Sequence, residues 1–141
     1  MKLYYSPGAC SLSPHIVLRE SGLPFDLALA STKTHKLADG SDYYAINPKG
    51  YVPLLELDSG ERLSEGPAIV QYIADQVPQK NLAPANGTMP RYRLQEWLNF
   101  ITKMVKARER AALLKVQLEY IRMRFSEWQS HAATRRAEMK L

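Results

Sequence analysis

The chain has 141 residues, which is enough for one domain of ordinary size or for a small domain with an appendage. Its 45% hydrophobic and 23% charged residues are typical of a globular protein and exclude a disordered one. The single cysteine, Cys10, excludes a disulfide framework and suits a reducing compartment, so we expect a cytoplasmic location.

Neither a secretory leader nor a membrane span is expected. Lys2 leads into tyrosines and a turn instead of an apolar stretch. No segment approaches the roughly 18 uninterrupted apolar residues that a membrane span needs.

The composition changes along the chain. Residues 1–103 carry ten Lys or Arg and ten Asp or Glu, whereas residues 104–141 carry nine and four, which accounts for the whole net charge of +5. Proline and glycine do not occur after Pro90. These changes predict a domain over 1–80, a linker over 81–90 and a helical segment over 91–141.

Periodicity and turn residues predict a mixed α/β sandwich in the order β-α-β-(α)-β-β-α. Two consecutive strand–helix units favour parallel pairing, and the turn at 58–60 favours an antiparallel hairpin. The expected elements are strands at 2–6, 25–30, 52–57 and 61–63, a helix at 11–21 that Gly22 ends, weakly helical polar residues at 31–46 and a turn at 47–50.

A second helix is expected to begin at Ser64, whose hydroxyl would cap it, while Glu65 adds a favourable negative charge to its first turn. Its inward face would consist of Ile69, Val70, Tyr72, Ile73 and Val77.

A long helical segment is expected from Arg91, with Pro90 at the first helical position. An apolar stripe with spacings of four and three runs through Ala107, Ala111, Leu114, Leu118, Ile121, Phe125 and Trp128. The stripe is compatible with a coiled coil over about three heptads. It is also compatible with an ordinary amphipathic helix on the domain, which is the interpretation we favour.

Cys10 follows a short strand and the turn Ser6-Pro7-Gly8, and it lies at or just before a helix start. Exposed N–H groups and the positive end of the helix dipole favour a thiolate there. The alternative for a lone cysteine is a small buried hydrophobic residue.

Three local signals indicate one ligand crevice: Cys10, the strand start at Val52-Pro53, and the helix start at Ser64-Glu65-Gly66. Helix starts bind carboxylates, and an extended strand beginning at Tyr51 could pair its backbone with a peptide-like ligand. The implied ligand is small, anionic and peptide-like, and either reacts with a thiolate or is itself a thiol.

Three motifs resemble the bacterial glutathione transferases of the beta class: Tyr5-Ser6-Pro7-Gly8-Ala9-Cys10-Ser11, Asn47-Pro48-Lys49-Gly50-Tyr51-Val52-Pro53 and Leu63-Ser64-Glu65-Gly66-Pro67-Ala68-Ile69. The resemblance covers residues 1 to about 101, through Arg91-Tyr92-Arg93-Leu94-Gln95-Glu96-Trp97-Leu98-Asn99. It implies a thioredoxin-like fold for the N-terminal domain, followed here by a short all-α segment of one or two long helices.

The resemblance also implies residue roles. Pro53 would be a cis-proline that presents the Val52 backbone to the cysteinyl part of glutathione, and Cys10 would contact the glutathione sulfur. The γ-glutamyl end would be held by Ser64, Glu65 and Gly66, with Glu65 meeting its ammonium group. Ala9, Tyr51 and Asn99 complete the set expected from these motifs.

A basic residue is expected near positions 33–36, where an ungapped comparison places His35 at the family's usual lysine, between Lys33 and Lys36. His35 and Lys36 are therefore candidate glutathione-binding residues, and solvated surface charge is the alternative for all three. Ser64 and Glu65 could act only as a helix cap and as a partner of the helix dipole. Residues 47–50 could form only a turn, and Tyr5 and Ser6 could have a purely structural role.

After about Ile101 the resemblance ends. The family continues into a helical domain at least as large as the first, which covers the electrophile pocket and supplies a histidine that helps to polarise the thiol. Lys106 stands at the matching position, and the only later histidine is His131. The family's later Ser/Thr-x-x-Asp capping box is absent as well. We therefore interpret the chain as a truncated or internally deleted member.

The first functional hypothesis is a glutathione transferase of bacterial detoxification, which conjugates the glutathione thiol to small hydrophobic electrophiles, with weak activity, no metal and no cofactor beyond this co-substrate. The second is a non-conjugating glutathione-binding or thiol-disulfide module. The third is a non-enzymatic, dimerising adaptor with a basic helix. Nucleic acid is not favoured as a partner, because no aromatic stacking platform accompanies the basic residues. An exposed apolar face favours a homodimer.

Overall fold

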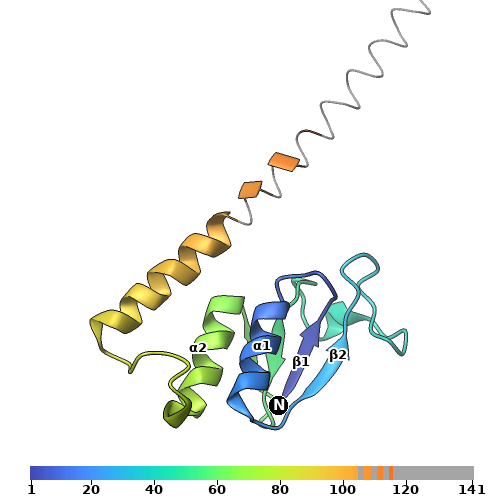
Figure 1. The fold of residues 1–141 in the computed structure, drawn as a ribbon. Coiled ribbons are helices and arrows are strands. Elements are labelled where there is room, and N and C mark those ends of the chain that lie inside the picture. The colour runs from blue at the N-terminus through green and yellow to red at the C-terminus, as the bar shows by residue number, and fades with distance from the viewer. Residues whose placement is uncertain (105–106, 109–110, 113–114, 116–141) are drawn as a thin grey trace, which may run out of the picture. The chain divides into compact units, whose positions relative to one another are not determined.

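The computed structural model describes residues 1–104, 107–108, 111–112 and 115. Contacts divide the chain into two compact units, Met1–Asn99 and Phe100–Leu141. Figure 1 shows the elements of the first unit, which are in chain order β1 (Lys2–Tyr5), α1 (Leu12–Ser21), β2 (Asp26–Leu29), the 3₁₀ helix η1 (Tyr43–Ala45), β3 (Leu54–Glu56), β4 (Arg62–Ser64), α2 (Gly66–Gln76) and the 3₁₀ helix η2 (Pro78–Lys80).

The four strands form one mixed sheet in the order β2-β1-β3-β4. β1 is parallel to β2 and antiparallel to β3, which in turn pairs with β4 in an antiparallel hairpin. Both kinds of pairing follow the sequence prediction: the crossover through α1 gives the parallel pair, and the tight turn gives the hairpin.

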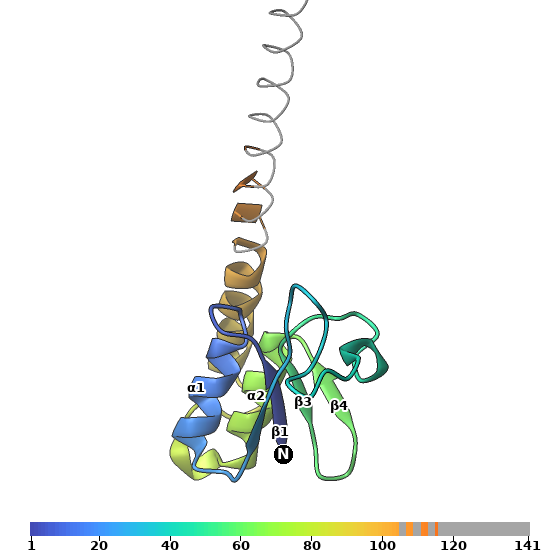
Figure 2. The ribbon, with the colours of Figure 1, turned by 90° about the vertical axis from the view of Figure 1, so that its right-hand side faces the viewer.

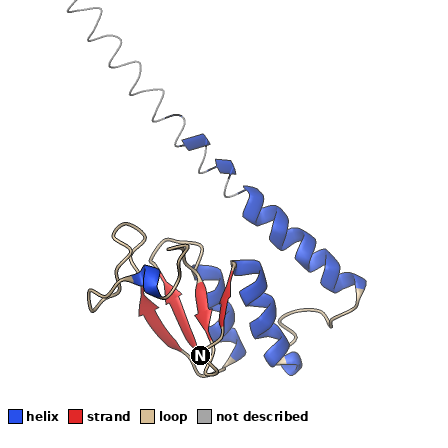
Figure 3. Cartoon of the chain, turned by 180° about the vertical axis from the view of Figure 1, so that it is seen from behind, coloured by secondary structure: helices blue, strands red, loops and turns tan. Residues whose placement is uncertain are grey.

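Helices α1 and α2 cover the same face of the sheet (Figure 3). Leu3 and Leu55 from the strands pack with Leu18 of α1 and with Ile69 and Ile73 of α2, and all five side chains are fully buried. Burial of each such side chain contributes about 1.5–3 kcal/mol, so this cluster is the main stabilising core of the unit.

The long connection between β2 and β3 covers the opposite face of the sheet (Figure 2). Tyr4 and Leu54 of the sheet pack there with Ala30, Tyr43 and Val52 of the connection. Because this connection forms a core of its own, its position on the sheet is fixed by packing.

The predicted fold class and most predicted elements are confirmed. α1 ends at Gly22, which adopts φ 73° and donates its N–H to the Arg19 carbonyl. The inward face of α2 is confirmed by the burial of Ile69, Val70 and Ile73, with Val77 buried just after the helix. The stretch at 31–46 contributes only the three residues of η1 as helix.

Two predictions about the hairpin region are corrected. The strand expected over 52–57 is confined to Leu54–Glu56, because a cis peptide bond precedes Pro53 and Leu57 already bonds across the turn to Glu61. The predicted capping role of Ser64 is wrong: Ser64 is the last residue of β4 and pairs with Leu54, and Glu65 occupies the N-cap without a side-chain cap hydrogen bond.

A helix expected from Arg91 begins at residue 89 and is described to residue 104, so Pro90 lies in its first turn. The predicted stripe from Ala107 to Trp128 lies mostly outside the described residues, as do Lys106 and His131. Within the part of the chain that the structure describes, no helix combines the length and hydropathy needed to cross a membrane.

The start of this helix is tied to α2 by Arg91, whose side chain is only 6% exposed. Its guanidinium donates two hydrogen bonds to the Asp75 carboxylate, at 2.8 and 2.6 Å, and further bonds to the Gln71 side chain and the Pro84 carbonyl. These hydrogen bonds hold the pKa of Asp75 below its usual 3.8, although burial opposes the shift.

We predict that Arg91→Lys lowers the free energy of unfolding by about 1–3 kcal/mol, because an ammonium cannot reproduce the paired bonds of a buried guanidinium. The loss is measured by urea denaturation at pH 7. The pKa of Asp75 is lower in the folded protein than in the unfolded chain. The contact with Arg91 therefore stabilises the fold fully above the unfolded pKa of Asp75, and this stabilisation is lost as the pH falls through the folded pKa. The difference between the two proteins should therefore shrink below about pH 4.

Arg93→Lys is the matched control on the same helix. Arg93 is 71% exposed and pairs with Glu96 at 3.6 Å, so its replacement should have little effect on stability. Equal losses for the two variants, or a difference that stays constant down to pH 3, would contradict the assignment to Arg91 and Asp75.

Candidate functional site

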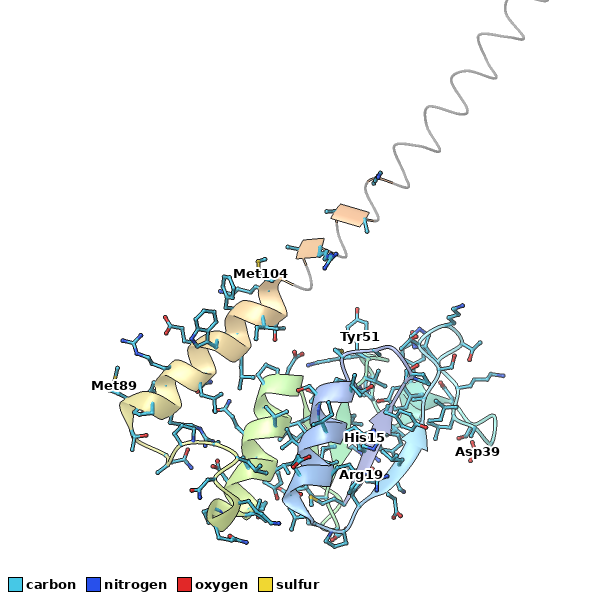
Figure 4. The ribbon with its side chains drawn as sticks, viewed as in Figure 1. His15, Arg19, Asp39, Tyr51, Met89 and Met104 are labelled. Atoms are coloured by element: carbon cyan, nitrogen blue, oxygen red, sulfur yellow. The ribbon has the colours of Figure 1, made fainter. Side chains whose placement is uncertain are left out.

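Three consecutive backbone carbonyls, those of Gly50, Tyr51 and Val52, each accept a hydrogen bond from a side chain. We call this the carbonyl row. The row runs just before β3, and Figure 4 shows the Tyr51 side chain projecting away from the domain, in keeping with its 71% exposure.

The middle carbonyl of the row is held by two buried side chains. The Tyr43 hydroxyl donates to the Tyr51 carbonyl at 3.0 Å, and the Asn47 amide donates to it at 2.7 Å. Burial raises the pKa of Tyr43, so its hydroxyl stays protonated and remains a donor at neutral pH. The side-chain oxygen Oδ1 of Asn47 also accepts the Lys49 N–H, which closes the turn.

Cys10 holds the last carbonyl of the row. Its Sγ lies 3.2 Å from the Val52 oxygen, and because a carbonyl only accepts, this bond is made by the protonated thiol. The loop that carries Cys10 is closed by the buried Ser11, whose hydroxyl accepts the Ser6 N–H and donates to the Ser6 carbonyl, both at 3.1 Å. Cys10 itself is exposed, as a reactive thiol must be, which excludes the alternative of a buried hydrophobic residue.

The peptide bond between Val52 and Pro53 is cis, as the family resemblance implied. Both residues are buried, and within the described residues the Val52 N–H donates no hydrogen bond. The backbone of Val52 therefore presents a donor that a ligand could use.

Strand register brings the Ser64-Glu65-Gly66 segment to the same edge. Tyr4 pairs with Leu54, and Leu54 pairs with Ser64. The end of β1, the start of β3 and the end of β4 therefore lie side by side, and each leads directly into a predicted site segment.

Glu65 adopts an unusual backbone conformation, with φ 72° and ψ 117°, at the start of α2. A positive φ in a residue other than glycine is strained, and such strain concentrates at functional sites. The Glu65 backbone carbonyl accepts the N–H groups of Ala68 and Ile69, while its exposed carboxylate makes no cap hydrogen bond.

His35 holds the first carbonyl of the row and also has a positive φ, of 53°. Its Nδ1 lies 3.2 Å from the Gly50 oxygen, and its ring stacks on Tyr44 with centroids 4.6 Å apart. Of the three basic candidates, His35 is the one that the structure joins to the carbonyl row by a contact.

The remaining candidates are not joined to the row. Lys33 and Lys36 are exposed, and in the described part of the chain their ammonium groups form no ion pair or hydrogen bond. Asn99 is exposed on the helix that begins at residue 89. Ala9 is half-buried beside Cys10 and packs against the core of the β2–β3 connection.

An apolar pocket of about 160 Å³ lies elsewhere in the first unit. Its lining comes from α1, α2, the linker and the helix that follows, and consists of Ser13, Val17, Val70, Gln71, Leu82, Ala83, Leu94 and Leu98. None of the candidate site residues lines it, so we assign the chemistry to the sheet edge, where the thiol lies. Among the described residues, no three His, Cys, Asp or Glu side chains are grouped so as to hold a metal ion.

Sequence reasoning missed Tyr43 and the wider role of Asn47. The turn predicted at residues 47–50 is present, with the Gly50 N–H donating to the backbone carbonyl of Asn47 at 2.8 Å. The Asn47 side chain also holds the Tyr51 carbonyl of the carbonyl row. The sequence did contain a signal for this role, because Asn47 is the first residue of a turn and an expected buried strand follows that turn.

We predict that Gly50→Ala lowers the free energy of unfolding by about 2–4 kcal/mol. Gly50 has φ +66°, and an added Cβ would lie 2.6 Å from Cε1 of Tyr44 and 2.8 Å from Nδ1 of His35. The alanine would therefore combine backbone strain with displacement of the His35 ring. Urea denaturation measures the loss.

Gly22→Ala is the control, because Gly22 has φ +73° and nothing within 4 Å of an added Cβ. It should cost about 1 kcal/mol through the backbone alone. If both alanine variants lose the same stability, the packing of His35 and Tyr44 against Gly50 contributes nothing.

Residues 8–76 match the family model described as glutathione S-transferase, N-terminal domain. Glutathione S-transferase GstA of Escherichia coli O157:H7 is 52% identical over 101 residues, which cover 72% of this chain and 50% of that protein. Glutathione S-transferase GST-4.5 of Xanthomonas campestris is 44% identical over 101 residues, covering 72% and 48%.

Solved structures agree with these matches. The bacterial transferase BphK, solved as a ternary complex, is 67% identical with a TM-score of 0.71, over 72% of this chain and 51% of that one. A sphingomonad glutathione S-transferase in complex with glutathione is 54% identical with a TM-score of 0.68, over 71% and 50%. The chain spans about half the length of the curated relatives it matches. Residues 8–76 belong to the glutathione S-transferase family as its N-terminal domain, and the matched part of the chain resembles the bacterial members of the beta class.

Proposed function

We propose that this protein binds glutathione at the edge where β1, β3 and β4 meet and conjugates its thiol to small hydrophobic electrophiles. The observation that carries the proposal is the Cys10 thiol 3.2 Å from the carbonyl of Val52, next to a cis-proline. Relatives of about twice the matched length are named glutathione S-transferases, and one similar structure holds glutathione.

The proposed roles follow from the chemistry of each group. The Val52 backbone pairs with the cysteinyl residue of glutathione as an added strand would. Glu65 meets the γ-glutamyl ammonium, and the N–H groups at the start of α2, from Gly66 on, together with Ser64, meet the neighbouring carboxylate. Ala9, Tyr51, Lys36 and Asn99 flank the ligand.

Cys10 would lie beside the glutathione sulfur. Conjugation needs a glutathione thiolate, which attacks the electrophile, while the leaving group departs with the bonding electron pair. A donor beside the sulfur stabilises this thiolate, and the bound geometry replaces a bimolecular encounter by an oriented one. We expect weak turnover, because the contacts proposed here hold glutathione and none of them holds the electrophile.

A second candidate function is thiol–disulfide exchange, which the exposure of Cys10 favours. The Cys10 thiolate would attack one sulfur of glutathione disulfide, forming a mixed disulfide and releasing one glutathione thiolate. The adaptor hypothesis rests on the basic segment after residue 104, most of which lies outside the described residues.

The function is tested by calorimetric titration with glutathione and by turnover of a generic aryl halide. We predict binding by the native protein and binding about tenfold weaker for Glu65→Gln, because the variant loses a charge-assisted contact with the ammonium. Glu61→Gln, which removes an exposed carboxylate in the hairpin turn, is the control and should bind as the native protein does.

Absence of binding heat in the native protein would overturn the proposed function. Binding without turnover, together with a mass increase of one glutathionyl group after exposure to glutathione disulfide, would establish the second candidate. That mass increase should be absent in Cys10→Ala.

We further propose that the protein is a cytoplasmic homodimer. Tyr92 and Trp97 are 58% and 61% exposed on the first unit, and exposed aromatic side chains are enriched at interfaces. Sedimentation at micromolar concentration should give the mass of two chains. Trp97→Glu should shift this equilibrium toward the monomer by about tenfold or more, because it places a charge in the contact. A native protein that sediments as a monomer would exclude the dimer.

A further inference from the structure

The loop over residues 81–88 contains the sequence Asn86-Gly87 at the centre of a tight turn. The turn runs from Ala85 to Thr88, and the N–H and the hydroxyl of Thr88 both donate to the Ala85 carbonyl, at 3.4 and 2.7 Å. Gly87 has φ 78° and the φ of Asn86 is not positive, which is the pattern of a type II turn. A residue with a side chain would be strained at the position of Gly87.

The backbone nitrogen of Gly87 is open to reaction. Asn86 and Gly87 are both exposed, and nothing lies within 4 Å of the position that a Cβ on Gly87 would occupy. Among the residues that the structure describes, the Gly87 N–H has no hydrogen-bond acceptor, because the turn uses the N–H of Thr88. Solvent therefore reaches this N–H, and no side chain shields the nitrogen.

An exposed asparagine followed by glycine supports a ring closure. The Gly87 nitrogen, once its proton has passed to solvent base, attacks Cγ of Asn86 and forms a C–N bond. Ammonia leaves with the electron pair of the Cγ–Nδ2 bond after taking a proton from water, and a succinimide remains. Water opens this ring at either carbonyl and gives aspartate or isoaspartate. The sum converts an amide and water into a carboxylate and ammonium, without an oxidant or a reductant.

The other asparagines of the chain are less suited to this reaction. The sequence has four, of which Asn47 precedes a proline and therefore has no N–H beside it to react. Asn81 and Asn99 precede a leucine and a phenylalanine. A side chain on the following residue restricts the backbone angles and shields the attacking nitrogen. Asn86 is thus the asparagine at which ring closure is least hindered.

The side chain of Asn86 belongs to the contacts around Arg91. Its Nδ2 donates to Oδ2 of Asp75 at 3.2 Å, and the same oxygen accepts a hydrogen bond from Arg91 at 2.6 Å. The bond from Asn86 also helps to hold the pKa of Asp75 below its usual 3.8. One guanidinium charge balances one carboxylate charge in this group. The bond from Asn86 is exposed, so it restrains the side chain only weakly.

We propose that Asn86 is a site of spontaneous deamidation, and that the reaction replaces its hydrogen bond to Asp75 by a contact between two carboxylates. Arg91 then faces two negative charges, and the isoaspartate product adds a backbone carbon to the turn that precedes the helix. Both changes weaken the contact between Arg91 and Asp75, which connects the start of this helix to α2. The inference is independent of glutathione binding.

The modification is tested by incubating the full chain at pH 8 and 37 °C and mapping its tryptic peptides by mass spectrometry. The peptide 81–91 should gain about 1 Da, and fragmentation should place the gain at Asn86 and not at Asn81 in the same peptide. We expect the rate at Asn86 to exceed the rates at Asn81 and Asn99 by about tenfold or more, and Gly87→Ala to slow it by a similar factor. Equal rates at the three asparagines, or a Gly87→Ala variant that reacts as fast as the native protein, would overturn the assignment.

The effect on the contact between Arg91 and Asp75 is tested with Asn86→Asp, which introduces the charge of the product directly. Its urea midpoint at pH 7 should lie about 0.5 M below that of the native protein. Asn81→Asp is the control, since it adds the same charge to an exposed residue of the same loop and should leave the midpoint unchanged. Equal midpoints for the two variants would overturn the proposed effect on the contact.

Discussion

The carbonyl row at Gly50, Tyr51 and Val52 is the constraint on which the site depends. A backbone carbonyl that is buried outside a strand ladder without a hydrogen-bond donor destabilises the folded state. Here the donors are side chains from the loop before α1 and from three places along the β2–β3 connection, namely His35, η1 and the turn that follows η1. Because each segment also packs into one of the two cores or pairs with the sheet, the row fixes the segments relative to one another, and they in turn fix the Val52 backbone.

The donors of the row divide into two chemical kinds. Tyr43 and Asn47 are buried and neutral, and burial raises the pKa of Tyr43 further from the physiological range. Both stay uncharged at neutral pH, so they support the middle carbonyl there without a change of charge. His35 and Cys10 hold the outer carbonyls and are both ionisable. The donors of the middle carbonyl are thus enclosed by the fold, whereas the half-buried His35 and the exposed Cys10 lie where solvent reaches them.

The features that the sequence predicted correctly depend on local chemistry. The Gly22 stop, the hairpin turn and the placement of Cys10 before a helix each follow from a few neighbouring residues. The cis bond at Pro53 followed only from the family resemblance. Ser64 was misassigned because its preference for an N-cap is overridden by pairing with Leu54, which extends β4 by one residue and leaves Glu65 to make the turn. The contacts of His35 and Arg91 could not be predicted, since each depends on a tertiary arrangement that no local pattern encodes.

Binding and turnover need not change together in this protein. The carbonyl row and all its donors lie between Cys10 and Val52, and the strand register adds Ser64 to Gly66, so the residues up to Gly66 contain every contact argued for glutathione except that of Asn99. These contacts are made in the ground state as well as in the transition state, and such uniform binding lowers KM without raising kcat. Rate acceleration needs groups that orient the electrophile and stabilise charge as the bond forms. Under the proposed function, glutathione affinity therefore reports on the sheet edge, and the ratio of conjugation rate to affinity reports on the groups that hold the electrophile.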